Sequence, residues 1–414
     1  MKKLLKIAVA SPIAALLMSG CAPSTEKTVE LSSSDTSCKS AEQGAVVASK
    51  FDGNMNDAAS LASAWKNASC TSVMLYPQKT VHSNDKNTNG LMADAKGVKA
   101  SVKALYNDQK IALMVYWDDS EASYQGESAD KYSDGFAIQF AKDSSDPKKL
   151  PYVGMGSDDR PVVIYMQKST KASFEPNGNG KHDMQLDEQS LNKFGEELKD
   201  YDKEVAKLGD SDFQKAFVAE GFRSTTELRD AKNSFNADMV HENGKWRGTF
   251  VKDIKDANLE LSSEFPIALA IWDGNKENRD GQKWLSSWVA VELGKTQGNL
   301  EKAVTSVPNG NVANGKTLAV ENCAACHIFD DQKMASAMQA PDLSALGGQS
   351  TAEYIIESLK NPSAVVVPGY NRNAYPNFKW YELADGKRVS TMPAYDWMSE
   401  EQLNDLAAYF KTLK

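Results

Sequence analysis

The sequence predicts a multidomain protein in which a β-sandwich with a helical insertion is followed by a small all-α domain. Three observations lead to this fold class. Short runs of β-branched and aromatic residues recur between residues 102 and 293, as is typical of strands in an all-β domain. A charged segment from about 174 to 215 has Leu and Phe at helical spacing, which predicts a solvated helical insertion. The remainder, beyond about residue 313, has mainly helical patterning.

The composition excludes one class of function. The chain has 414 residues, with 47 Lys and Arg against 56 Asp and Glu, so its formal net charge is −9. This surplus of negative charge argues against a nucleic-acid partner bound through a basic surface. The hydrophobic fraction of 41% supplies enough apolar surface for a core. We therefore expect a globular protein that binds no nucleic acid.

Residues 1–20 are predicted to be an export signal. Three lysines precede a mostly apolar stretch from Ile7 to Met18, and Ser19-Gly20-Cys21 follows. The stretch is too short for a spanning helix and ends in small residues. Residues 17–21 resemble a bacterial lipobox, which implies that Cys21 is lipidated. The alternative is an ordinary cleaved signal with an incidental Cys.

Residues 21–45, rich in Ser, Thr, Glu and Lys, predict a flexible tether. No other uninterrupted apolar run reaches about 18 residues, so the lipid would be the only membrane anchor. Ala22 follows Cys21, whereas an Asp there often retains a lipoprotein at the inner membrane. We therefore expect the periplasmic side of a membrane, with the outer membrane favoured over the inner one.

The expected β domain spans residues 46–295. Its strand-like segments are bounded mostly by Asn, Asp, Gly or Pro, which favour turns. Asn107-Asp108-Gln109-Lys110 predicts a hairpin turn between the first two strands. The predicted strands are 102–106, 111–117, 135–140, 161–166, 246–251, 267–272 and 288–293.

Residues 296–312 contain Gly, Gln, Asn, Ser and Pro and predict a linker. A helical domain over residues 313–414 follows. It closes with Ser399-Glu400-Glu401-Gln402, a capping box that predicts the start of a helix. The apolar residues after the box have helical spacing, so the domain is expected to end in an amphipathic helix.

Cys323-Ala324-Ala325-Cys326-His327 is the strongest chemical signal in the chain. A C-x-x-C-H motif places two thiols to form thioethers with haem vinyl groups, while the adjacent His reaches the iron. The alternative is a redox-active or zinc-binding cysteine pair. The adjacent His, the export signal and a distal Met favour haem. Cys323 and Cys326 are thus predicted to hold haem c covalently, with His327 as an iron ligand.

The region from about 310 to 414 resembles a class I cytochrome c. In that family a Met on a later loop supplies the sixth iron ligand, and Met392 in Thr391-Met392-Pro393-Ala394-Tyr395 matches this position. The resemblance also implies that the Pro341 carbonyl orients His327, although a Pro in that loop is equally consistent with ordinary turn chemistry. Met is more often a packing residue than a ligand. The rival methionines in this domain are Met334, Met338 and Met398.

Two cysteines remain when Cys21 is assigned to lipid and Cys323 and Cys326 to haem. These are Cys38 and Cys70. An oxidising compartment favours a disulfide between them, and the alternative is a pair of free thiols. Such a disulfide would tie the tether to the β domain.

The residue pattern of the β domain alone indicates only a soluble sandwich with aromatic strands. Several of its segments, however, resemble the haem b-binding gamma subunit of ethylbenzene dehydrogenase and its relatives in the dimethyl sulfoxide reductase type II group. They occur in the family's order over about residues 70–295. The similar segments are Leu75-Tyr76-Pro77-Gln78, Val102 to Tyr106, Tyr116 to Ser120, Gly154-Met155-Gly156, Ala219 to Phe222, and Trp272-Asp273-Gly274 continuing through Lys283 to Trp288.

This resemblance implies a haem b held without covalent bonds at one end of the sandwich, with a Met and a Lys as axial ligands. The matching residues are Met155 and Lys283. A Lys binds iron only as the free amine, so its pKa must lie well below the usual value of about 10.4. Met166 and Lys168, on the strand after Met155, are rival candidates.

The resemblances together imply a lipid-anchored dihaem electron carrier. Its expected partners are periplasmic redox proteins, among them a molybdenum enzyme with an iron–sulfur subunit. Two axial ligands fill the coordination of an iron, so an electron-transfer subunit is expected rather than a catalytic one. Two alternatives stay open. One is a monohaem cytochrome c fused to a β-sandwich that binds or senses a ligand, and the other is an enzyme with catalysis at haem b.

Overall fold

The computed structural model describes residues 38–79, 91–92, 94–124, 132–172, 211–295, 298–332, 340–372 and 378–414. Residues 34–414 form one compact unit. The predicted signal peptide, Cys21, most of the tether and most of the helical insertion lie outside the described residues. In the described part of the chain, no helix is long and apolar enough to cross a bilayer.

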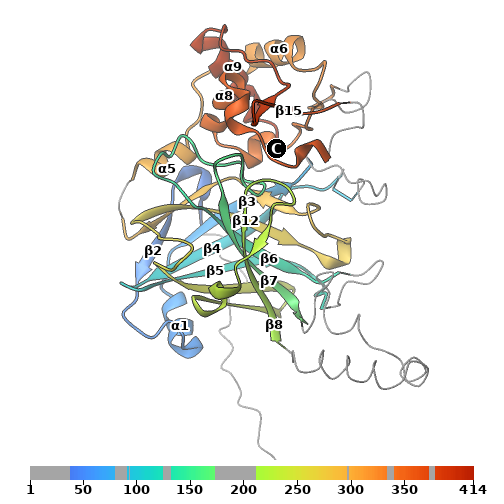
Figure 1. The fold of residues 1–414 in the computed structure, drawn as a ribbon. Helices are drawn as coiled ribbons and strands as arrows, with labels where there is room; N and C mark the ends of the chain where they lie inside the picture. Colours follow the sequence, from blue (N-terminus) through green and yellow to red (C-terminus); the bar gives the residue numbers. More distant parts are fainter. Residues whose placement is uncertain are drawn as a thin grey trace, which may run out of the picture. The chain divides into compact units, whose positions relative to one another are not determined.

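A β-sandwich-like domain is built from one continuous sheet, which has 14 strands among the described residues (Figure 1). Most neighbouring strands are antiparallel, but β2 runs parallel to β4 and β14, and β1 runs parallel to β3. The strands are β1 (Lys39–Ser40), β2 (Val46–Lys50), β3 (Cys70–Pro77), β4 (Val98–Tyr106), β5 (Lys110–Asp118), β6 (Gly135–Ala141), β7 (Val162–Ala172), β8 (Ser211–Ala219), β9 (Thr226–Glu227), β10 (Phe235–Glu242), β11 (Lys245–Asp253), β12 (Glu264–Trp272), β13 (Trp284–Ser286) and β14 (Val289–Leu293).

Side-chain alternation along the strands creates apolar clusters on both faces of the sheet. In β6 every residue is buried. Phe136, Ile138 and Phe140 enter the main core of the sandwich, whereas Ala137 and Ala141 belong to a second cluster. This second cluster, called the outer cluster here, consists of Ala137, Ala141, Leu150, Val153, Val162, Ile164, Ala219, Ala268, Ala270, Leu285, Trp288, Ala290 and Leu300.

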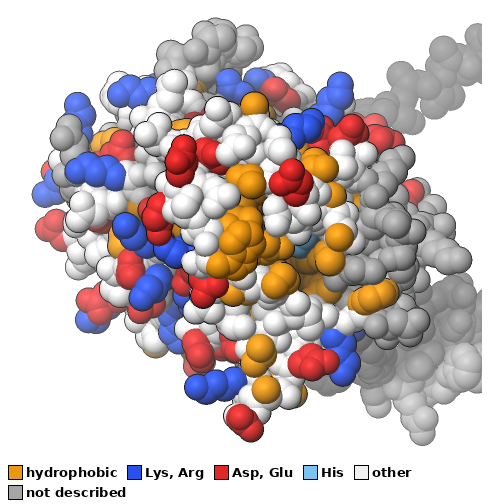
Figure 2. All heavy atoms as spheres, turned by 90° about the horizontal axis from the view of Figure 1, so that it is seen from above, with side chains coloured by type: hydrophobic (Ala, Val, Ile, Leu, Met, Phe, Trp, Pro, Cys, Tyr) orange, Lys and Arg blue, Asp and Glu red, His pale blue; other side chains and the backbone are white. Residues whose placement is uncertain are grey.

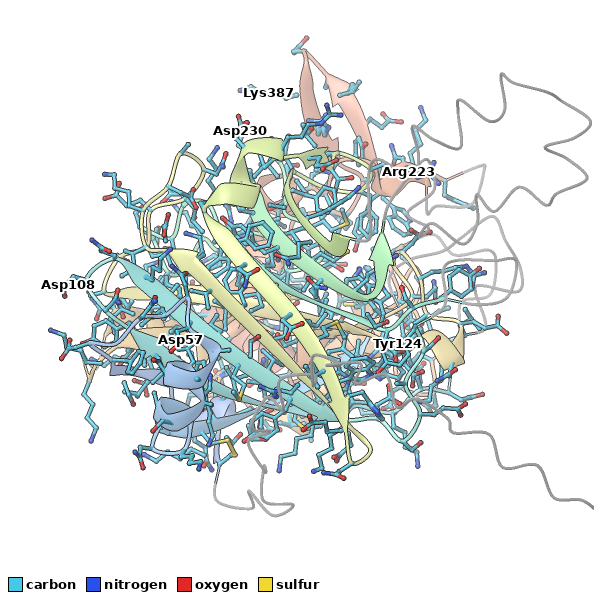
Figure 3. All side chains as sticks on the ribbon, turned by 90° about the horizontal axis from the view of Figure 1, so that it is seen from below. Asp57, Asp108, Tyr124, Arg223, Asp230 and Lys387 are labelled. Carbon is cyan, nitrogen blue, oxygen red and sulfur yellow. A yellow bond between two sulfur atoms is a disulfide. The ribbon has the colours of Figure 1, made fainter. Side chains whose placement is uncertain are left out.

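The predicted strands and the first turn are confirmed. Each predicted strand overlaps one of the observed strands β4, β5, β6, β7, β11, β12 and β14. In the β4–β5 turn, the Asn107 N–H donates to the Lys110 carbonyl at 3.0 Å. Asp108 of this turn and Asp57, the N-cap of helix α1 (Ala58–Trp65), lie at the periphery of the domain (Figure 3).

Three boundaries differ from the sequence-based expectation. Lys39–Ser40, inside the predicted tether, pairs with β3. β8 begins at Ser211, inside the predicted helical insertion, and pairs with β7. Helix α5 (Asn299–Val304) lies inside the predicted linker. Polar composition predicts exposure, but strand pairing depends on a partner that is distant in sequence, so composition cannot locate these ends.

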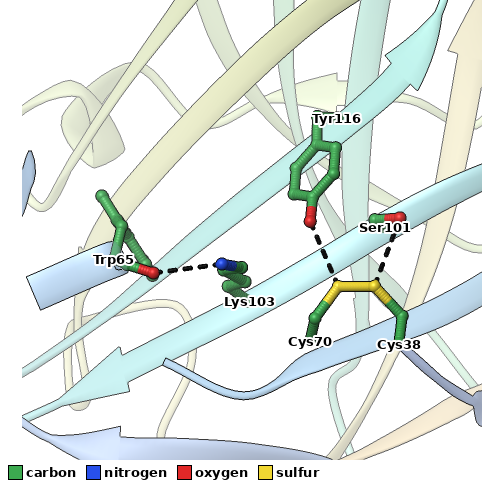
Figure 4. Close-up of a disulfide and its surroundings, with 6 residues drawn as sticks. All are labelled: Cys38, Trp65, Cys70, Ser101, Lys103 and Tyr116. Atoms are coloured by element: carbon green, nitrogen blue, oxygen red, sulfur yellow. Dashed lines mark hydrogen bonds between the residues drawn. A yellow bond between two sulfur atoms is a disulfide. The ribbon is translucent and has the colours of Figure 1, made fainter. Parts of the chain in front are cut away.

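A disulfide joins Cys38 to Cys70 with an S–S distance of 2.01 Å (Figure 4). The Tyr116 hydroxyl lies 3.1 Å from the Cys70 sulfur, and the Ser101 hydroxyl lies 3.8 Å from the Cys38 sulfur. Because Lys39 pairs with Thr71 in β3, the disulfide closes the start of this two-strand contact. It therefore ties the beginning of the described chain to the sandwich.

The C-terminal domain is mainly helical and contains, in its described part, one small hairpin that the sequence did not predict. Its last helix begins with a complete capping box, in which Gln402 N–H donates to Ser399 Oγ and Ser399 N–H donates to Gln402 Oε1. A Cβ at Gly315 would lie 1.9 Å from the Asp405 carbonyl, so this glycine permits the close approach of the first and last helices. The elements are α6 (Val312–Asn322), α7 (Leu346–Gln349), α8 (Ala352–Lys360), β15 (Tyr381–Ala384), β16 (Lys387–Ser390) and α9 (Glu400–Phe410).

Candidate haem-binding sites

The cysteines and histidine of the C-x-x-C-H motif lie around one cavity of the C-terminal domain. The motif follows the end of α6, where the N–H groups of Cys326 and His327 both donate to the Cys323 carbonyl, at 3.1 and 2.9 Å. This tight turn brings three side chains to the same cavity. In the view from above, hydrophobic side chains gather around a hollow, and histidine atoms are visible within it (Figure 2).

The burial of Cys323 disfavours the redox-active alternative. Burial raises the pKa of its thiol to about 12, whereas thiol–disulfide exchange needs a thiolate. Cys326, by contrast, is exposed. In the described part of the chain, no cluster of three potential metal-binding side chains includes either cysteine or His327. The pair therefore fits covalent attachment to haem vinyl groups better than metal binding.

His327 has the orientation and protonation state that an iron ligand needs. Its Nδ1 lies 2.7 Å from the Pro341 carbonyl oxygen, and a hydrogen bond donated there leaves Nε2 without a proton. Burial lowers the pKa of the imidazole, against the opposing effect of the Pro341 hydrogen bond. The contact with Pro341 that the cytochrome resemblance implies is thus present, and the ring is held neutral.

Met392 lines the same cavity as His327 and both cysteines. Its N–H donates to Ser390 Oγ at 3.1 Å, just after the end of β16. Met398 instead belongs to the buried core of the domain, while Met334 and Met338 lie outside the described residues. Among the described methionines of the C-terminal domain, Met392 alone lines the cavity.

A buried polar atom in this cavity supports the fit of a haem. Trp380 lines the cavity, and its Nε1 is buried without a hydrogen-bond partner among the described residues. An unpaired buried donor costs about 1–3 kcal/mol, and a haem carboxylate is a suitable acceptor. Tyr152 of the β domain lines the cavity too. Sequence reasoning missed both residues, because an aromatic residue in a strand or loop is usually assigned to a core.

Met155 lies in an uncommon backbone conformation in the loop between β6 and β7. Its φ angle is 81°, a left-handed value that is rare for a residue with a side chain. The loop is held by hydrogen bonds from Gly221 N–H to the Met155 carbonyl at 2.7 Å and from Gly156 N–H to the Tyr152 carbonyl at 2.9 Å. The Met155 side chain packs against the outer cluster.

Lys283 lies immediately before β13 and is only 6% exposed. Its Nζ donates to the Asp280 carbonyl at 3.1 Å and lies 5.3 Å from the centre of the Trp272 ring. Burial lowers the pKa of the amine to about 8, which makes the iron-binding neutral form accessible near neutral pH. Trp272 packs against the outer cluster, as Met155 does. The two predicted haem b ligands therefore lie toward the same apolar face.

The rival residues Met166 and Lys168 project from the same face of β7 as Ile164, an outer-cluster residue. Met166 packs against that cluster, so it stays a candidate beside Met155. Lys168 is more exposed than Lys283. A buried amine and a Met that lie toward the same apolar face suit haem b, and burial makes Lys283 the better candidate amine.

Comparison with family models gives two consecutive matches. The model described as ethylbenzene dehydrogenase matches residues 62–284, which is more than half of the chain. The chain belongs to the ethylbenzene dehydrogenase family. A cytochrome c model matches residues 312–414. The ethylbenzene dehydrogenase region, which contains Met155 and Lys283, points to haem b, and the cytochrome c region indicates covalent haem c. The protein is thus an electron-transfer cytochrome.

Similarity to solved structures is weak. A family 9 carbohydrate-binding module from Caldicellulosiruptor kristjanssonii in complex with cellotriose has 8% identity and a TM-score of 0.29, covering 61% of this chain and 95% of the module. A putative carbohydrate-binding protein from Bacteroides uniformis has 8% identity and a TM-score of 0.31, covering 64% and 94%. Similarity at this level carries no information about a ligand. No curated protein matches the chain.

Replacing Met392 by alanine should lower the midpoint potential of haem c, because a thioether opposite a neutral imidazole favours reduced iron. The expected decrease is on the order of 0.1 V, within the range of ~0.8 V that axial ligands set. Redox titration of the covalent haem measures it. Met398→Leu, at a buried core position, is the matched control and should leave the potential unchanged. An unchanged potential in Met392→Ala would assign the sixth ligand to another residue.

Proposed function

We propose that this protein is a lipid-anchored dihaem cytochrome that passes single electrons between haem b in the β domain and haem c in the C-terminal domain. The observation that carries the proposal is the loop from Tyr152 to Met155. Tyr152 lines the haem c cavity, and Met155, a predicted haem b ligand, follows three residues later. One short segment thus borders both sites.

Direct contacts between the β domain and the C-terminal domain support a fixed arrangement of the two haems. Arg160 forms a bidentate pair with Glu357, at 2.8 and 2.6 Å. The Phe222 N–H donates to the Pro368 carbonyl at 2.7 Å, and its ring stacks on Tyr370 with 4.7 Å between the ring centres. Because contacts of this kind restrict relative motion, they favour electron transfer inside the molecule over exchange between freely moving domains.

The protein side chains supply ligation and insulation in this proposal. Each haem, when bound, supplies an iron that alternates between its ferrous and ferric states. His327 and Met392 would hold the iron of haem c, while Met155 and Lys283 would hold that of haem b. With both positions filled, a substrate has no free coordination site. This argues against the alternative of catalysis at haem b, which requires an open or displaceable position.

The proposed partner is a periplasmic molybdenum oxidoreductase of the dimethyl sulfoxide reductase type, with an iron–sulfur subunit as the direct electron donor or acceptor. A lipid on Cys21 would hold the protein at the periplasmic side of a membrane, and Ala22 favours the outer membrane. The net charge of −9 suits docking to a basic partner surface. Such association weakens as ionic strength rises.

The test is a count of haem in the pure protein by pyridine haemochrome spectra, before and after extraction with acidified acetone. We expect one covalent haem that stays with the protein and one b-type haem that is extracted. Covalent haem alone, in protein produced with ample haem, would contradict the dihaem proposal. It would favour a monohaem cytochrome c fused to a β-sandwich that binds or senses another ligand.

A further inference from the structure

A buried glutamine lies directly opposite Lys283. β13 pairs with β3 so that Trp284 opposes Pro77. The Gln78 N–H continues this ladder by donating to the Lys283 carbonyl at 2.9 Å. Directly opposed residues of antiparallel strands project from the same face, with Cβ atoms about 4.5–5.5 Å apart. The Gln78 side chain therefore emerges beside that of Lys283.

The other end of the Gln78 side chain reaches the loop that contains Met155. Gln78 Nε2 lies 3.0 Å from the position that a Cβ would take at Gly154, the residue before Met155. The absence of a side chain at Gly154 leaves room for this approach. Gln78 thus lies between the segments that carry the two predicted haem b ligands.

The Gln78 amide has no hydrogen-bond partner among the described residues. The residue is 1% exposed, and both Oε1 and Nε2 are buried and unpaired. Buried polar side chains are rarely left in this state, and an unpaired one points to a bound water, ion or other ligand, or to a catalytic or redox role. Since the amide offers both an acceptor and donors, a polar group is expected beside it in the mature protein.

The hydrogen bonds that an iron-bound Lys283 amine needs indicate which polar group lies beside Gln78. A neutral amine that gives its lone pair to iron keeps two N–H donors. The Asp280 carbonyl, 3.1 Å from Nζ, accepts one of them. The second donor needs another acceptor, and Gln78, whose Oε1 is unpaired among the described residues, is the residue that opposes Lys283 in the strand pairing. Groups that ligate a metal are commonly oriented by hydrogen bonds of this kind.

We propose that Gln78 is a positioning residue of the haem b site, whose side-chain carbonyl accepts a hydrogen bond from the iron-bound amine of Lys283. This inference rests on the proposed function, because it requires haem b at Lys283. The hydrogen bond holds the amine on the iron and increases its electron donation. It therefore slows ligand replacement and lowers the haem b potential.

Three variants of the full-length holoprotein test the inference. Gln78→Leu removes both hydrogen-bonding groups at similar size, whereas Gln78→Glu keeps an acceptor. Gln167→Leu is the matched control, since Gln167 is also a buried glutamine with an unpaired Oε1 but lies on β7. For each variant, the b-type haem content, the haem b potential and the rate at which cyanide replaces the lysine ligand are measured.

In Gln78→Leu we expect a higher haem b potential and cyanide replacement faster by at least about tenfold, the lower end of the effect of outer-sphere partners. Gln78→Glu should retain the wild-type replacement rate, and Gln167→Leu should be unchanged in every measurement. If Gln78→Leu does not fold, Gln78→Glu is the deciding variant. Cyanide binding to haem b in Gln78→Glu that is as fast as in Lys283→Ala, which has no lysine ligand, would overturn the inference.

The outcome also separates this inference from the proposed function. Wild-type protein without extractable haem would overturn both. Wild-type protein with haem b, together with a Gln78→Leu variant of unchanged potential and cyanide rate, would overturn only the role of Gln78.

Discussion

Replacement of both Cys323 and Cys326 by alanine is expected to abolish covalent haem attachment and leave the extractable haem b in place. Both thiols line the cavity that contains His327 and Met392, and each is predicted to form one of the two thioethers. Without them the haem is held only by axial ligands and packing, so acidified acetone should remove all of it. The measurement is the covalent haem content of the denatured protein. Cys326→Ala alone should leave at most one thioether.

The disulfide cysteines provide the matched control for this experiment. Replacing Cys38 and Cys70 by serine also removes two sulfur atoms, but these lie in the β domain between β1 and β3. This control should keep its full covalent haem content. Covalent haem retained in the Cys323→Ala/Cys326→Ala variant would show that attachment does not use the C-x-x-C-H motif.

Lys283→Ala should remove the b-type haem or change its spectrum while leaving haem c unaffected. The substitution deletes one predicted iron ligand near the apolar face against which Trp272 and Met155 pack. Optical and paramagnetic resonance spectra of the extractable haem report the ligand set. Lys168→Ala, on β7, is the matched control and should retain the wild-type spectrum. A normal b-type spectrum in Lys283→Ala together with a changed one in Lys168→Ala would assign the ligand to Lys168.

The same lysine predicts a pH dependence of haem b binding. Burial lowers the pKa of Lys283 to about 8, and ligation needs the neutral amine, so binding below this pH releases a proton. Haem b affinity should therefore rise with pH, by up to about tenfold per unit, until it levels off above about pH 8. Lys283→Ala should lack this slope. Haem titration of the b-depleted protein at pH 6 to 9 measures it, and a pH-independent wild type would contradict the assignment.

The haem c motif and the main strands were predictable from the sequence because their signals are local. The C-x-x-C-H motif predicts two thioethers and an iron ligand within five residues, and the structure places all three side chains at one cavity. Alternating β-branched and aromatic residues predicted β4 to β7, since a strand with a buried face needs that period. The capping box at Ser399 is also a local signal, and it predicted the start of α9.

Features that depend on distant segments were decided only by the tertiary structure. Polar composition did not reveal that Lys39–Ser40 pairs with β3 or that Tyr152 of the β domain borders the haem c cavity. The approach of Gln78 to both Lys283 and Gly154 joins segments about 70 to 200 residues apart. Local patterns report which face of an element is apolar. They do not report which other element covers that face. The covering of these faces buries Lys283 and Gln78, and the Gln78 amide has no hydrogen-bond partner among the described residues.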